Sequence, residues 1–292
     1  LANSLAKESV LYVVSDAAAN PSHEDAINAI RDYIKTINGF KEVNLIARPT
    51  NMGSYASVSN AFDFVIKKHG KIIFLEDDIY VTPNFLNFLN DGLKAYNDNY
   101  KVFSVSAYSF PCILPTMTSS SVYFFNGHSP WGFATWANRW NNIDFLLNDF
   151  NEQIKNRGLF KKLKNTAPNA TLILLLDRAR IINAMDARIY FNLIKNDQYV
   201  VFPTISLTRN TGHDGSGEHC GTNNTYMNQK IDDGSFTYSF PPNIYKNEQI
   251  YNVLKVYFKV TFRGNIDIFL LKHRFYSLYK FYRKCLKMLK NA

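Results

Sequence analysis

The chain has 292 residues, and 46% of them are hydrophobic. This composition excludes a disordered segment and is sufficient for one large globular core or two small ones. No uncharged apolar run reaches the roughly 18 residues of a membrane-spanning helix. The formal net charge is +9, but residues 251–292 carry ten Lys or Arg against one acid, and residues 1–250 carry 23 of each sign. A body without net charge excludes the basic surface that a nucleic-acid duplex requires.

The three cysteines, Cys112, Cys220 and Cys285, are far apart in the sequence. Their odd number and spacing match neither a disulfide framework nor a zinc site. Because free thiols are typical of reducing compartments, we expect a cytoplasmic protein.

The first part of the chain alternates between amphipathic segments and short apolar runs. Apolar residues recur every three or four positions in residues 23–37 and 57–68, which is typical of helices that bury one face. Short runs rich in Val, Ile and Leu lie before, between and after them. This alternation predicts crossover connections and a parallel sheet of the α/β class. The expected strands are Ser9–Ser15, Val43–Ala47 and Ile72–Leu75.

Three consecutive acids, Glu76, Asp77 and Asp78, follow the third of these strands. Ligands of open α/β sheets bind beyond the carboxyl ends of the strands, and Mg²⁺ prefers carboxylate and phosphate oxygens. The segment therefore predicts a metal that bridges a phosphorylated substrate to the protein. The alternative is that Asp77 and Asp78 only precede a helix that starts at Pro83, because acids are favoured near helix N-termini.

All three tryptophans, Trp131, Trp136 and Trp140, lie in one ten-residue stretch in the middle of the chain. Clustered aromatic residues usually form core, but an aromatic face also packs well against the apolar face of a pyranose. Both interpretations stay open. We expect strands in the neighbouring segments 101–110, 122–125 and 199–203, helices at 144–163 and 177–194, and a polar loop at 161–169 followed by a short apolar run at 172–176.

The segment Ser206–Cys220 contains three glycines within six positions, interleaved with His213, Asp214 and His219. Glycines at this density allow the backbone to approach a ligand closely, and histidines among them are able to contact a metal or a phosphate. A surface turn with unrelated histidines is the alternative. The segment lacks the Gly-Lys-Ser/Thr ending of a phosphate-binding P-loop.

The segment from Ile266 onward predicts a basic amphipathic helix. It is rich in Phe, Tyr and Leu and contains seven Lys or Arg. Helices of this kind bind the interface of anionic membranes. The alternative is packing against the protein's own core or against a second copy in a homodimer.

These segments resemble bacterial glycosyltransferases of the nucleotide-sugar-dependent GT-A type, and more narrowly the family-2-like sugar transferases of capsule, O-antigen and exopolysaccharide gene clusters. The resemblance covers most of residues 10–221. The matching segments are SDAAAN (Ser15–Asn20), ARPTNMGSYASVSNAF (Ala47–Phe62), IIFLEDDIYVTPNFLNFLNDGLKAY (Ile72–Tyr96), VFSVSAYSFP (Val102–Pro111), SPWGFATWANRW (Ser129–Trp140), AMDARIYFNLI (Ala184–Ile194) and RNTGHDGSGEHCG (Arg209–Gly221).

The resemblance implies a GT-A fold with a mostly parallel sheet flanked by helices, in a catalytic domain of residues 1–250 with a helical tail at 251–292. It implies that Asp78, with Glu76 or Asp77, forms a DXD-like site for Mn²⁺ or Mg²⁺ on the donor diphosphate. His219, and after it His213, are the further metal or phosphate ligands that it implies.

The resemblance also implies roles for residues in three other segments. Asp16, Arg48 and Asn51 match positions that contact the nucleotide, and with Asp77 and Trp131 they form the expected donor-binding set. Asp186 matches the catalytic base, although Met185 replaces the usual aromatic neighbour.

The expected function is therefore inverting transfer of a sugar from a nucleotide-sugar donor to a glycan or lipid-linked acceptor, at the inner face of a bacterial membrane. Relatives have a further strand ahead of LANSLAKES that contributes to the nucleotide pocket, and we expect it to be missing here. A non-catalytic nucleotide- or sugar-binding module is the second hypothesis. A nucleotidyltransferase is the third, although no basic Gly-rich triphosphate loop supports it.

Overall fold

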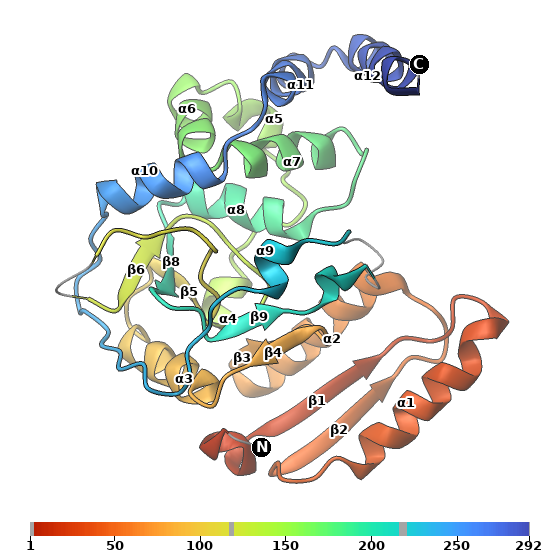
Figure 1. Cartoon of the computed structure of the whole chain (residues 1–292), viewed down its shortest axis with the longest axis vertical. Helices are drawn as coiled ribbons and strands as arrows, with labels where there is room; N and C mark the ends of the chain where they lie inside the picture. Colours follow the sequence, from red (N-terminus) through yellow and green to blue (C-terminus); the bar gives the residue numbers. More distant parts are fainter. Residues whose placement is uncertain (1–2, 117–119, 216–220, 292) are drawn as a thin grey trace.

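The computed structural model describes residues 3–116, 120–215 and 221–291. It is a mixed α/β chain with a five-stranded sheet, a two-stranded parallel sheet and a two-stranded antiparallel ribbon. Figure 1 shows the five-stranded sheet in the middle, the parallel pair β1 and β2 at one end, and helices α11 and α12 at the opposite end. The class predicted from the sequence is confirmed at this level.

The two-stranded parallel sheet pairs β1 (Val10–Ser15) with β2 (Glu42–Ala47), as the sequence predicts. The connecting helix α1 (Glu24–Thr36) and the following helix α2 (Gly53–His69) are also close to their predicted positions. Short 3-10 turns precede β1 and α1. They are Ser4–Glu8 and Pro21–His23.

Helix α2 contacts both sheets and so joins the small one to the main body. The Tyr12 hydroxyl of β1 lies 2.9 Å from Nε2 of His69 at the end of α2, and its ring packs edge-on against Phe64. On another face of α2, Phe62 and Ile66 enter the main hydrophobic core. Apolar burial therefore stabilises this helix on the side of the main sheet, and more exposed contacts connect it to β1.

The main sheet has the order β3-β7-β5-β8-β6 and is mixed rather than mostly parallel. Only β5 and β8 pair in parallel among its described strands, and the other three pairings are antiparallel. The prediction of a mostly parallel sheet is wrong because β7, the strand from the tryptophan segment, inserts between β3 and β5 in the opposite direction. The strands are β3 (Lys71–Phe74), β5 (Val102–Ser106), β6 (Val122–Phe125), β7 (Phe133–Trp136) and β8 (Tyr199–Pro203).

The sequence reading fails in the helical region after the tryptophan segment. The expected helix at 144–163 is two helices, α5 (Phe150–Gln153) and α6 (Arg157–Thr166). The expected loop at 161–169 is the end of α6 and the start of α7 (Pro168–Arg178), which contains the apolar run. Pro168 suits a first helical position because its missing N–H would have no partner there. The expected helix at 177–194 is α8 (Met185–Lys195) after a break.

The C-terminal segment forms three helices that pack on the rest of the chain. Ile250 and Leu254 of α10 (Glu248–Tyr257) belong to the same core cluster as the main sheet. Ile268 and Leu271 of α11 (Phe262–Lys272) belong to a second core cluster with α6, α7 and α8. Helices α10 and α11 therefore each contribute residues to a core cluster of the body. The last helix is α12 (Tyr276–Asn291).

Candidate functional site

The acidic turn after β3 and the glycine-histidine segment lie against each other. A short strand, β4 (Ile79–Val81), follows the acids and pairs antiparallel with β9 (Thr208–Asn210). The carbonyl of Asp78 accepts hydrogen bonds from the backbone N–H of Thr211 at 2.8 Å and from its hydroxyl at 2.7 Å. The acids do not lead directly into a helix, since β4 intervenes and α3 (Phe85–Ala95) begins after Asn84.

Gly212 allows the Asp78 carboxylate to lie directly on the loop after β9. A Cβ atom at this position would overlap Oδ2 of Asp78. The other carboxylate oxygen, Oδ1, is buried and has no hydrogen-bond partner among the described residues. Burial, and then the charge of Asp77, raise the pKa of Asp78, while Asn210 and His213 act in the opposite direction. Asp78 is therefore a carboxylate with an unused oxygen.

His213, in the single turn Gly212–Asp214, presents a second unused polar atom. Its Nδ1 lies 3.3 Å from the carbonyl of Gly221, and its buried Nε2 has no partner among the described residues. A proton on Nδ1 donated to that carbonyl leaves the lone pair of Nε2 available to a ligand. Trp131 packs edge-on against the ring at 5.7 Å, and Tyr226 lies 4.6 Å away.

An aromatic-walled cavity of about 440 Å³ lies beside this loop. Its polar wall includes His128, Asp186, Asn169 and Asn223. The aromatic part of the wall comes from the segment after β5, the tryptophan segment, α9 (Asn224–Met227) and the end of α10. Its rings are Tyr108, Phe110, Trp131, Tyr226, Tyr257 and Phe258.

The turn around Gly132 separates the three tryptophans. Gly132 has φ of +93°, a conformation that favours glycine, and its N–H donates to the carbonyl of Pro130. Trp131, before this turn, faces the cavity. Trp136 and Trp140 follow it in β7 and α4 (Ala137–Trp140) and are buried, with Trp140 stacked on Phe62 at 3.9 Å. The core interpretation is therefore correct for Trp136 and Trp140, but not for Trp131.

Asp186, in the first turn of α8, lies at the cavity with a 48% exposed side chain. Desolvation raises its pKa to about 6. Desolvation also raises the pKa of Glu76 to about 7, with the charge of Asp186 as the next cause. The effect of the Asp186 charge on Glu76 indicates that the acidic turn lies near the cavity.

His128 lies beside Asp186 and is a residue that the sequence interpretation missed. Its Nε2 is 3.7 Å from Oδ1 of Asp186, and its side chain is only 2% exposed. Burial lowers the pKa of His128 to about 3, so at neutral pH the ring has no charge. Its edge packs on Phe133 at 4.7 Å.

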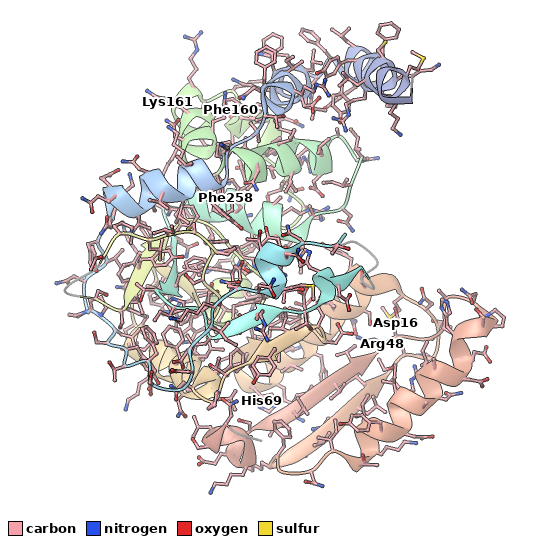
Figure 2. All side chains as sticks on the ribbon, viewed as in Figure 1. Asp16, Arg48, His69, Phe160, Lys161 and Phe258 are labelled. Carbon is pink, nitrogen blue, oxygen red and sulfur yellow. The ribbon has the colours of Figure 1, made fainter. Side chains whose placement is uncertain are left out.

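The three expected nucleotide contacts lie at the ends of β1 and β2 and bond to the protein itself. The Asp16 carboxylate accepts hydrogen bonds from the N–H groups of Ala17 and Met52. The Asn51 side chain donates to the carbonyl of Ala17 at 2.8 Å, and Arg48 donates to the carbonyl of Ser57 at 2.9 Å. Figure 2 shows Asp16 and Arg48 close together there. These bonds stabilise the loops after the two strands.

The structure thus brings together only part of the predicted set. Glu76, Asp78, Trp131, Asp186 and His213 surround one region, with Asp77 exposed beside it. His219 lies outside the described residues. The missed residues, besides His128, are Tyr108, Asn169, Asn223, Tyr226, Tyr257 and Phe258.

Two sequence signals were available for these residues. His128 directly precedes the segment SPWGF, and Tyr226 follows the glycine-histidine loop closely. The other residues come together only through the fold.

Within the described ranges, no group of three or more His, Cys, Asp or Glu side chains is arranged as a metal site. Asp78 and His213 still fit a divalent cation, because each has a buried atom without a partner among the described residues, and a carboxylate with phosphate oxygens is a common ligand set for Mg²⁺ and Mn²⁺. Comparison of the sequence with protein-family profiles gives no match, and no curated protein is detectably similar.

Proposed function

We propose that the chain is a GT-A type glycosyltransferase that moves a hexosyl group from a nucleotide-sugar donor to a hydroxyl of a glycan or lipid-linked acceptor. The observation that carries the proposal is the aromatic-walled cavity with Asp186 at its edge, next to the unused polar atoms of Asp78 and His213. The sequence resemblance to polysaccharide transferases supports the same function. It also supports a place at the inner face of a bacterial membrane.

Asp186 is the proposed base for the acceptor hydroxyl. A pKa near 6 keeps the carboxylate ionised at neutral pH and makes it a stronger base than an ordinary aspartate. The neutral His128 beside it adds no positive charge that would lower this pKa. Deprotonation of the hydroxyl by Asp186 as it attacks the anomeric carbon, on the face opposite the leaving group, inverts the anomeric centre.

Asp78 and His213 are the proposed protein ligands of Mn²⁺ or Mg²⁺, with Glu76 near them. When bound there, the cation would neutralise charge on the departing nucleoside diphosphate. Gly212 keeps the Asp78 carboxylate against the loop, so that Asp78 and His213 act from adjoining positions.

The aromatic wall is the proposed acceptor-sugar subsite. Ring faces bind the apolar C–H face of a pyranose, and the polar groups of the wall bind its hydroxyls. The Tyr108 hydroxyl is suited to this role because it is buried without a hydrogen-bond partner in the part of the chain that is described. Trp131 is therefore placed on the acceptor side in this proposal, not with the donor.

The test is transfer or donor hydrolysis measured against pH, with and without Mn²⁺. Asp186→Asn should reduce turnover at least a hundredfold, since general-base catalysis contributes roughly 10²–10⁴-fold. Wild-type turnover should fall about tenfold per pH unit below the Asp186 pKa of about 6. Asp197→Asn, which alters a half-buried aspartate paired with Lys101 and Lys162, is the matched control. Full activity of Asp186→Asn would contradict the proposal.

A second candidate function is a non-catalytic nucleotide- or sugar-binding module. The hydrogen bonds that Asp16, Arg48 and Asn51 make within the protein favour its sugar-binding form, because they occupy groups expected to contact a nucleotide. A rise in melting temperature with a free sugar or glycan, with no shift from any nucleotide-sugar and no turnover at any pH, would identify this function instead.

A further inference from the structure

Helix α12 has an apolar stripe that is exposed rather than packed in the core. Leu278, Phe281, Cys285 and Met288 recur every three or four residues and so lie along one side of the helix. Leu278, Phe281 and Met288 are 53%, 65% and 55% exposed. A different side of the same helix, at Tyr279, is buried against the second core cluster.

Exposed aromatic rings continue this surface onto α11 and the turn that follows it. Phe269 is 55% exposed and Phe275 is 49% exposed. Together with His273 they form a ring cluster with centroid separations of 4.8 to 6.3 Å. Phe262, at the start of α11, is 81% exposed. Exposed apolar side chains that lie together mark an interaction site rather than ordinary surface.

Cations flank the apolar residues and meet few acids. Arg283 is the only Lys or Arg of α11 and α12 with an ion pair among the described side chains, to Asp267 at 3.3 Å. Lys280, Lys284 and Lys287 are exposed and lie along the side of α12 next to the stripe, with Lys284 about one turn after Phe281. Because residues 1–250 have no net charge and residues 262–291 contain eight Lys or Arg against one acid, this segment holds most of the positive excess of the molecule.

We propose that the exposed faces of α11 and α12 bind an anionic lipid surface. The apolar stripe and the ring cluster would enter the boundary between headgroups and acyl chains, while the lysines contact the anionic headgroups. The described helices include none that is long and apolar enough to cross a membrane. The proposal does not depend on the proposed transferase activity.

The charge of this surface decides between a membrane and a second copy of the chain. A symmetric dimer through these helices would bring the two sets of lysines together, and like charges across an interface are costly. An anionic bilayer instead lowers the energy of each lysine by roughly 1 kcal/mol, or about fivefold in partitioning.

The experiment is flotation of the full chain with phosphatidylcholine vesicles, with and without phosphatidylglycerol, at low and high salt. We expect binding only to the anionic vesicles and its loss at high salt. The variant Lys280→Gln/Lys284→Gln/Lys287→Gln should weaken partitioning roughly a hundredfold. Its control, Lys41→Gln/Lys67→Gln/Lys94→Gln, has the same net charge but alters exposed lysines on the body and should bind like the wild type.

A second pair of variants tests the apolar contribution. Leu278→Ser/Phe281→Ser should weaken partitioning at least tenfold, since each exposed side chain loses the apolar area it would bury. The control is Leu146→Ser/Ile113→Ser, which removes residues that are 73% and 94% exposed elsewhere. Melting temperatures of all four variants should equal that of the wild type, because every altered side chain is exposed.

Two results would overturn the proposal. One is equal binding of the lysine variant and its control, which would show that net charge alone attracts the protein. The other is a chain that ignores anionic vesicles but forms a dimer that Leu278→Ser/Phe281→Ser dissociates in light scattering. That result would assign the surface to a second copy.

Discussion

At the scale of single residues, His128 ties the stability of the fold to pH. Burial lowers its pKa from 6.5 to about 3, so the unfolded chain binds more protons between these two values. Its contribution to stability is therefore fully present above pH 6.5 and is lost as the pH falls through 3.

We expect the free energy of unfolding to drop by about 3 kcal/mol more in the wild type than in His128→Gln between pH 7 and pH 4. Gln does not titrate, so its folded state has no buried group to protonate. Urea unfolding at a series of pH values measures this difference. Parallel pH profiles for the two proteins would show that His128 does not ionise on unfolding.

Gly212 gives a test of the Asp78 site that leaves its polar groups in place. In Gly212→Ala the new methyl group would overlap the Asp78 carboxylate, which must then move from the loop. Nucleotide-dependent Mn²⁺ binding, followed by calorimetry, should weaken about tenfold or more. Gly158→Ala in α6 is the control, because its Cβ atom would meet only the Asn156 side-chain oxygen at 3.2 Å and the residue lies outside the metal site. Equal Mn²⁺ affinities of the two variants would show that Gly212 is not part of the metal site.

At the scale of elements, the close contact between α3 and β5 leaves no room for a side chain at Gly92. A Cβ atom at Gly92 of α3 would lie 2.7 and 2.9 Å from the two methyl carbons of Val105. Alanine gains about 1 kcal/mol over glycine in a helix interior, but overpacking a core costs roughly 1–3 kcal/mol. Val105 is fully buried and β-branched, so it has little freedom to yield.

Gly92→Ala should therefore lower the melting temperature, with a net loss of about 1 kcal/mol. Gly158→Ala in α6 serves as the control, since its Cβ atom would meet only the Asn156 side-chain oxygen at 3.2 Å. A rise in melting temperature for Gly92→Ala would mean that helix propensity outweighs the contact with Val105.

The elements that the sequence predicted well are those with local signals. Helices α1 and α2 have regular apolar spacing, and β1 to β3 are short apolar runs bounded by turns. Helix α7 was missed because its apolar run is short and Pro168 resembled a loop residue. The place of β7 in the sheet follows from pairing between distant segments, which no local pattern contains.

The candidate site also contains some residues with a local sequence signal and others that only the fold reveals. The acidic turn, the tryptophan segment and the glycine-histidine loop carry unusual residue types that the sequence singles out, whereas Asp186 was named through the family resemblance. His128 and Tyr108 are ordinary residues whose importance comes from burial, which the sequence does not give. The roles of Asp16, Arg48 and Asn51 were inferred by resemblance, and their bonds within the protein are visible only in three dimensions.

At the scale of the whole molecule, α11 and α12 complete the second core cluster. Ile268, Leu270, Leu271 and Tyr279 are 2% to 7% exposed, and each buried apolar side chain contributes roughly 1.5–3 kcal/mol. Their sum is comparable to the entire stability of a typical domain.

A chain that ends at residue 259 should therefore aggregate or melt far below the full chain. Differential scanning fluorimetry on the two proteins tests this. The lysine variant of α12 should melt like the wild type, because its residues are exposed. An unchanged melting temperature in the shortened chain would mean that α10 alone closes the core.

Phe258 links the cavity to the C-terminal helices. Its side chain lines the cavity, its carbonyl accepts the N–H of Asn169 at the start of α7, and α11 begins four residues later. A ligand that moves Phe258 thus acts on the joint before α11. Thermodynamic linkage makes any such effect reciprocal. If an occupied cavity strengthens lipid binding by some factor, lipid must strengthen ligand binding by the same factor.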